Sequence, residues 1–85
     1  MYLEYKKTND TMDDAYQKFG HAIVLQAVKD YRSALKSLKQ SPGNVAASSM
    51  KHEVERFFHS GLYSAITSLD PEMLIAKLNE EVSSL

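Results

Sequence analysis

The sequence contains no cysteine, so neither a disulfide nor a cysteine-ligated metal can stabilise the fold. It has no apolar run close to the ~20 residues that a membrane span requires, and the segment from Met1 to Lys7 lacks the apolar stretch of a signal peptide. The net charge is −1, which does not favour a globally basic nucleic-acid-binding protein. We therefore expect a cytoplasmic protein, without membrane association, that folds by apolar packing or gains stability from a partner.

Proline and glycine are also scarce, and they mark the ends of four helices. No stretch alternates between apolar and polar residues over a useful length, so the sequence predicts an all-α fold. Cap residues precede all four predicted helices: the segment Asn9-Asp10-Thr11, then Asn44, Ser60, and Asp70 with Pro71 at the first helical position. The predicted helices span residues 12–40, 45–59, 62–68 and 71–82, and Gly20 either interrupts the first or lies within it. We predict an N-terminal tail over residues 1–10 and a single helical domain over residues 11–85.

The apolar residues of these helices fall on one face each, as in a small bundle of three to four helices. The short connection from Ser41 to Asn44 cannot span a helix, so the long first helix should lie antiparallel to the second. Two short helices should close the pair. The expected inner faces comprise Val24, Ala27, Val28, Tyr31, Ala34, Leu35 and Leu38, then Ala47, Met50, Val54, Phe57 and Phe58, then Leu74, Ile75, Leu78 and Val82. Among these, we expect Tyr31, Leu35, Val54 and Phe57 to form the core.

A stripe of basic residues runs along the first helix beside its apolar face. It comprises Lys18, Lys29, Arg32, Lys36 and Lys39, within an arc of about 80° at 100° per residue. Leu25 lies in the middle of this stripe, as expected for a contact surface with an apolar centre and a basic rim. The predicted partner-binding residues are Leu25, Lys29, Arg32, Lys36 and an exposed Tyr63. The alternatives are a solvated helix flank with one ordinary exposed leucine, or a stripe that follows a phosphate backbone.

Residue patterns for catalysis or for cofactor binding are missing from the sequence. The glycines are isolated at 20, 43 and 61, so no phosphate-binding loop is present, and no serine lies in a nucleophile-elbow pattern. His52, Glu55 and His59 share one side of a helix, but the two histidines are roughly 10 Å apart along its axis. Glu80 and Glu81 are best explained as a solvated helix end. We expect no catalytic residue, no cofactor and no metal site, and therefore no enzyme.

From Ala22 onward the chain carries a set of structural motifs. These are the helix face from Ala22 to Arg32, the segment from Glu53 to Ser60, the pair Leu69-Asp70, and the apolar residues Leu74, Ile75 and Leu78. On these motifs the chain resembles small uncharacterised helical proteins of prophages and integrative elements of Gram-positive bacteria.

The resemblance implies a phage or mobile-element accessory protein that binds a protein partner stoichiometrically, for example as an anti-CRISPR-like inhibitor of a host defence complex. The alternative is a small nucleic-acid-binding or replication and transcription regulatory protein that uses the basic stripe. Self-association into a homo-oligomer is a further open alternative.

Overall fold

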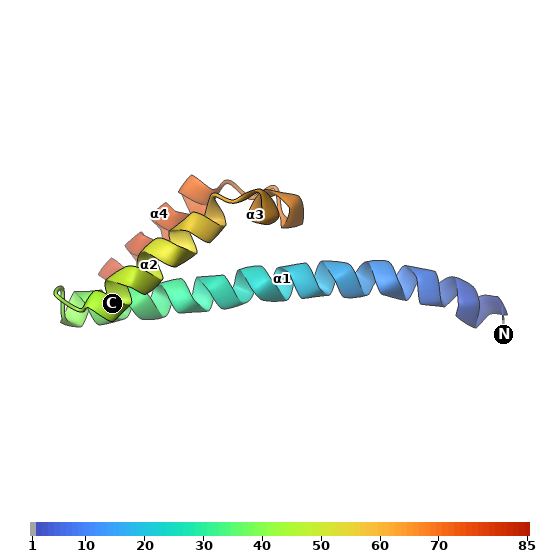
Figure 1. Cartoon of the computed structure of the whole chain (residues 1–85), viewed down its shortest axis with the longest axis horizontal. Coiled ribbons are helices and arrows are strands. Elements are labelled where there is room, and N and C mark those ends of the chain that lie inside the picture. Colours follow the sequence, from blue (N-terminus) through green and yellow to red (C-terminus); the bar gives the residue numbers. More distant parts are fainter. Residues whose placement is uncertain (1) are drawn as a thin grey trace.

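Four helices account for most of the chain. The computed structural model describes the backbone of residues 2–85 and the side chains from Lys18 onward. The helices are α1 (Tyr2–Gln40), α2 (Val45–Phe58), α3 (Gly61–Ile66) and α4 (Pro71–Ser83), and residues 2–85 contain no strand. The all-α prediction is confirmed, and the order of the helices is visible in Figure 1.

Helix α1 is longer than predicted, because it begins at Tyr2 and not near Met12. It also continues through Gly20, where the sequence left a break open. Gly20 is buried against α3, and a Cβ atom there would lie 3.1 Å from Cγ2 of Ile66. The glycine therefore allows α3 to approach α1 closely. The division into a tail over residues 1–10 and a domain from residue 11 stays a prediction, since the described side chains begin at Lys18.

The other three helices pack against the C-terminal half of α1. After the turn at Ser41–Asn44, α2 runs back antiparallel to α1, as predicted (Figure 1). Helix α3 lies at the far end of α2 and contacts α1 there. Helix α4 then packs along α1 and ends close to the C-terminal end of α1, where Lys39 Nζ donates to the carbonyl oxygens of Val82 at 3.0 Å and Leu85 at 2.7 Å. Of the two short helices, α3 covers one end of the pair and α4 lies along it.

The starts of α2, α3 and α4 follow the predicted caps, whereas α1 runs through the caps expected at residues 9–11. The Asn44 side chain accepts a hydrogen bond from the Ala47 amide at 3.0 Å, and Ser60 Oγ accepts one from the Tyr63 amide at 3.2 Å. Asp70 Oδ1 accepts from the Glu72 amide at 3.0 Å, with Pro71 in the first turn of α4. Each cap satisfies an amide that the helix itself leaves without a partner, so these boundaries were readable from local sequence.

The core lies between α1, α2 and α4 and is closed by α3. Its buried side chains are Val28, Tyr31, Leu35, Val54, Phe58, Tyr63, Leu78 and Val82. The predicted core residues Tyr31, Leu35 and Val54 are confirmed. Phe57 was the wrong choice for the centre: it is half-buried, while Phe58 is 0% exposed and packs edge-on against Tyr31 and Tyr63 at centroid distances of 5.7 and 5.6 Å. Met50, expected on the inner face, is exposed.

We therefore expect truncation of the two phenylalanines to lower the free energy of unfolding by different amounts. Phe58→Ala should lower the free energy of unfolding by about 3–5 kcal/mol, because it opens a cavity between three helices. Phe57→Ala should cost clearly less, since part of its ring already faces solvent. Urea denaturation followed by circular dichroism measures both. Equal losses for the two variants would show that Phe58 is not the centre of the core.

Candidate partner-binding surface

The predicted binding residues divide into an exposed group on α1 and one buried residue. Leu25 is 61% exposed, and Lys29 and Lys36 are exposed with it. Arg32 is half-buried and belongs partly to the interface with α4. The structure therefore brings Leu25 together with Lys29 and Lys36 on the solvent side of α1, and it separates Tyr63 from them.

Leu25 borders a shallow hollow of about 310 Å³. Its lining consists of His21, Val24 and Leu25 from α1 together with Thr67, which directly follows α3. Val24 is half-buried here and packs against the core, so the floor of the hollow is continuous with the interior of the bundle. An apolar side chain from a partner would therefore find both Leu25 and a fixed floor to contact.

Two cations of the basic stripe are used inside the bundle. Arg32 Nε donates to Glu81 Oε2 at 2.5 Å, and Arg32 Nη2 donates to Glu81 Oε1 at 3.2 Å. Lys39 is bound to carbonyl oxygens at the end of α4, where a cation is favoured by the helix dipole. Glu81 is exposed near the end of α4, as expected, and its carboxylate also joins α4 to α1. Lys39 is still exposed, and the exposed basic residues of the stripe outside these contacts are Lys18, Lys29 and Lys36.

Tyr63 is not a surface anchor, contrary to the prediction. It is 1% exposed, and its ring packs edge-on against Phe57 and Phe58 at centroid distances of 5.9 and 5.6 Å. Burial raises the pKa of Tyr63, and the nearby charge of Asp70 raises that pKa further. The ring fills the space between α2 and α3, so a partner could reach it only if the core opened.

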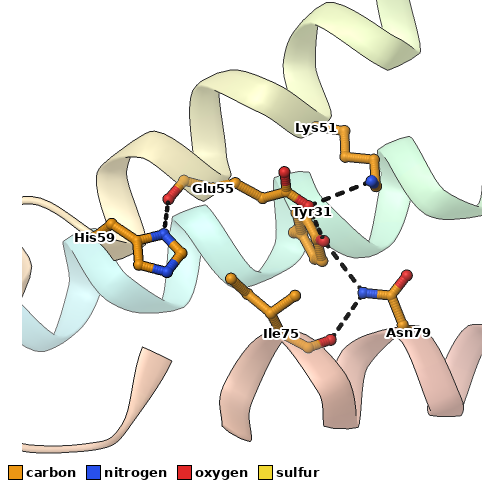
Figure 2. A network of polar contacts seen from close by, with 6 residues as sticks. All are labelled: Tyr31, Lys51, Glu55, His59, Ile75 and Asn79. Atoms are coloured by element: carbon orange, nitrogen blue, oxygen red, sulfur yellow. Dashed lines mark hydrogen bonds and ion pairs between the residues drawn. The ribbon is translucent and has the colours of Figure 1, made fainter. Parts of the chain in front are cut away.

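A network of polar contacts centred on Tyr31 joins three helices (Figure 2). The Tyr31 hydroxyl donates to Glu55 Oε2 at 2.6 Å, and Asn79 Nδ2 donates to the Tyr31 oxygen at 3.1 Å and to the Ile75 carbonyl at 2.8 Å. Lys51 Nζ lies 3.3 Å from the same Glu55 oxygen. The sequence analysis missed this network, although a tyrosine on the inner face of a helix signals that its hydroxyl needs a partner.

The electrostatics of this network favour a structural role. Burial, followed by the hydrogen bond to Glu55, raises the pKa of Tyr31 to about 12. Burial alone would raise the pKa of Glu55, but the Tyr31 hydroxyl and Lys51 outweigh it and lower that pKa below its ordinary value. At neutral pH the phenol therefore keeps its proton and the carboxylate stays ionised. This arrangement holds α1, α2 and α4 together.

One of the two histidines considered for metal binding, His59, has other contacts. His59 pairs with Glu72 of α4 through Nε2 and contacts the Glu55 carbonyl at 2.9 Å through Nδ1. Glu55 itself is bound to Tyr31, so His52, Glu55 and His59 do not converge. From Lys18 onward, no three histidine, aspartate or glutamate side chains come together as a metal-binding group.

Comparisons with protein-family models, curated proteins and solved structures found no significant match to this chain. Within the part of the chain that the structure describes, no helix combines the length and the apolar character needed to cross a membrane.

The two buried tyrosines provide a matched test of the polar network. Tyr31→Phe should lower the free energy of unfolding by about 1–3 kcal/mol, because it removes the donor to a half-buried carboxylate and the acceptor for Asn79. Tyr63→Phe should change that free energy little, since the Tyr63 hydroxyl makes no hydrogen bond in the described part of the structure. Urea denaturation at pH 7 measures both variants. A harmless Tyr31→Phe substitution would mean that the network does not stabilise the bundle.

The contact between His59 and Glu72 predicts a pH dependence of stability. The bond to Glu72, followed by the Glu55 carbonyl, raises the pKa of His59 above its ordinary value of 6.5. The stabilisation is therefore fully present below about pH 6.5 and disappears as the pH rises through the higher pKa of the folded state. His59→Gln should lower the Tm at pH 5.5 and leave it nearly unchanged at pH 8.5. His21→Gln, at an exposed histidine of α1, is the control, and a pH-independent effect of His59→Gln would contradict the assignment.

Proposed function

We propose that this protein is a non-catalytic accessory protein that binds a protein partner stoichiometrically through the solvent side of α1. The observation that carries the proposal is Leu25, whose side chain is 61% exposed in the middle of a helix, beside an apolar-floored hollow and between exposed lysines. We call Leu25, Lys29 and Lys36 the Leu25 surface. Apolar contact supplies most of the binding energy at such a surface, and the lysines at its rim favour one partner over others.

The chemistry of the partner follows from this surface. An apolar side chain would enter the hollow beside Leu25, and carboxylates around it would face Lys29 and Lys36. Arg32 contributes less than its position suggests, because both of its bonds to Glu81 would have to be given up or shared. The resemblance to mobile-element proteins favours a complex of the bacterial host as the partner, with a defence complex as the first example to test.

Nucleic-acid binding is the second candidate, supported by the exposed Lys18, Lys29 and Lys36. With Arg32 and Lys39 engaged inside the bundle, three cations of the stripe remain for phosphate contacts. The slope of log K against log salt on duplex DNA should then be no steeper than about −3. Such a short patch favours weak, salt-sensitive binding and makes nucleic acid the less favoured ligand.

The Leu25 surface can be tested with variants that leave the bundle intact. Leu25→Asp should weaken partner binding by about 30-fold or more, because it places a charge in the apolar centre of the contact. Val45→Asp is the matched control, since Val45 is 76% exposed at the other end of the bundle and its substitution should leave binding unchanged. Affinity purification from the host identifies the partner, and calorimetry with the purified partner gives the affinity and the stoichiometry.

Arg32 is left unsubstituted in this test, because its loss would also remove the ion pair with Glu81 that holds α4 against α1. Circular dichroism of each variant confirms that helicity is retained. Normal affinity of Leu25→Asp for the partner would place the binding surface elsewhere. Tight binding of duplex DNA that weakens steeply with salt would favour the second candidate instead.

A further inference from the structure

The N-terminal part of α1 extends beyond the bundle. The molecule is 59 Å long in its largest dimension, which is the length of a 39-residue helix. Within residues 2–85, no other helix lies beside the segment that precedes Gly20, where α3 meets α1 (Figure 1). We call residues 2–19 the overhang. A single helix of this length without tertiary contacts is marginally stable in water, so the overhang needs a partner to be well formed.

Apolar residues recur along this part of α1 at intervals of three and four. The heptad stripe consists of Tyr2, Tyr5, Asn9, Met12, Tyr16, Phe19 and Ile23. Six of these seven residues are apolar or aromatic, and all charged residues between positions 2 and 23 lie off the stripe. Apolar residues repeated at these intervals over three heptads are typical of a helix that packs against another helix in a coiled coil.

The heptad stripe lies on a different side of α1 from the core-facing residues and from the Leu25 surface. At 100° per residue, Phe19 lies about 180° from the buried Val28 and about 120° from Leu25. Of the two stripe residues whose side chains the structure describes, Phe19 is 67% exposed and Ile23 is half-buried. Phe19 is therefore covered neither by the core of its own bundle nor by a partner on the Leu25 surface.

We propose that the overhangs of two copies of this chain pair as an antiparallel coiled coil. Charge complementarity favours a second copy of the chain as the partner of the overhang, and it favours the antiparallel orientation. When two overhangs run antiparallel about a centre between Asp10 and Thr11, Lys6 of each copy lies opposite Asp13 of the other, and both pairs flank the stripe on the same side. The facing layers are then Tyr2 with Phe19, Tyr5 with Tyr16, and Asn9 with Met12. A parallel pair brings no such opposite charges together.

The lengths also fit. This register uses residues 2–19 of each copy, about 27 Å of helix, and stops one residue before Gly20, where Ile66 of α3 packs against α1. The two bundles then lie at opposite ends of the coiled coil and do not collide. Eight aromatic side chains at about 150 Å² each bury about 1,200 Å², which is within the range of specific protein–protein interfaces.

Sedimentation equilibrium of the full-length chain tests the self-association. We expect a monomer–dimer equilibrium in the micromolar range, with a dimer Kd raised about 100-fold by Phe19→Asp. Leu25→Asp is the matched control: Leu25 is 61% exposed and off the stripe, so the dimer Kd should not change. A chain that stays monomeric at 200 μM, or a Kd insensitive to Phe19→Asp, overturns the proposal. The proposed partner binding is affected by Leu25→Asp and not by Phe19→Asp, so the two claims fail separately.

Charge reversal and disulfide trapping test the direction. Lys6→Glu and Asp13→Lys should each weaken the dimer about 5-fold, and the double variant should restore it, because the reversed charges again face each other. The chain has no cysteine of its own, so Asn9→Cys and Met12→Cys can be introduced singly. A mixture of the two variants should form the mixed disulfide in preference to either homodimer. Preferential homodimeric disulfides, or no rescue by the double charge reversal, would contradict the antiparallel register.

Discussion

Tyr31 has no exposed surface, so its hydroxyl must find hydrogen-bond partners inside the protein. It finds Glu55 on α2 and Asn79 on α4, at 2.6 and 3.1 Å. Because one side chain on α1 contacts both neighbouring helices, the rotation of each helix about its own axis is fixed along with its position. Apolar packing alone tolerates many rotations of a small helix, whereas a buried hydroxyl with two partners tolerates few.

The placement of α4 has consequences for the surface of α1. Once Asn79 is held at Tyr31, the residues that follow it bring Glu81 to Arg32 and the last carbonyl groups of α4 to Lys39. Two cations of the basic stripe are thereby taken up within the bundle. The residues that remain on the solvent side form the smaller Leu25 surface, which we propose binds a protein partner. The fold thus determines which part of the basic stripe can act in binding.

Features that depend on neighbouring residues were predictable from the sequence, and features that depend on distant residues were not. Asn44 and Asp70 cap helices through amides two or three positions away, so their roles are visible locally. The choice between Phe57 and Phe58 depends on where α3 lies, because both fall on the apolar face of α2. Likewise, Glu81 is 49 residues from Arg32, and no periodicity in either helix indicates that they meet. Leu25 could be identified as exposed because the opposite face of α1 is so clearly apolar.

The central claim is that α1 has two independent sides, one that builds the bundle around Tyr31 and one that binds a partner through Leu25. The most direct test is amide chemical-shift mapping of the labelled chain during titration with its purified partner. We predict shifts concentrated at residues 21, 25, 29 and 36 and at Thr67, with the amides of α4 and of Tyr31 almost unchanged. Shifts concentrated on α2 and α4, with none around Leu25, would contradict the claim.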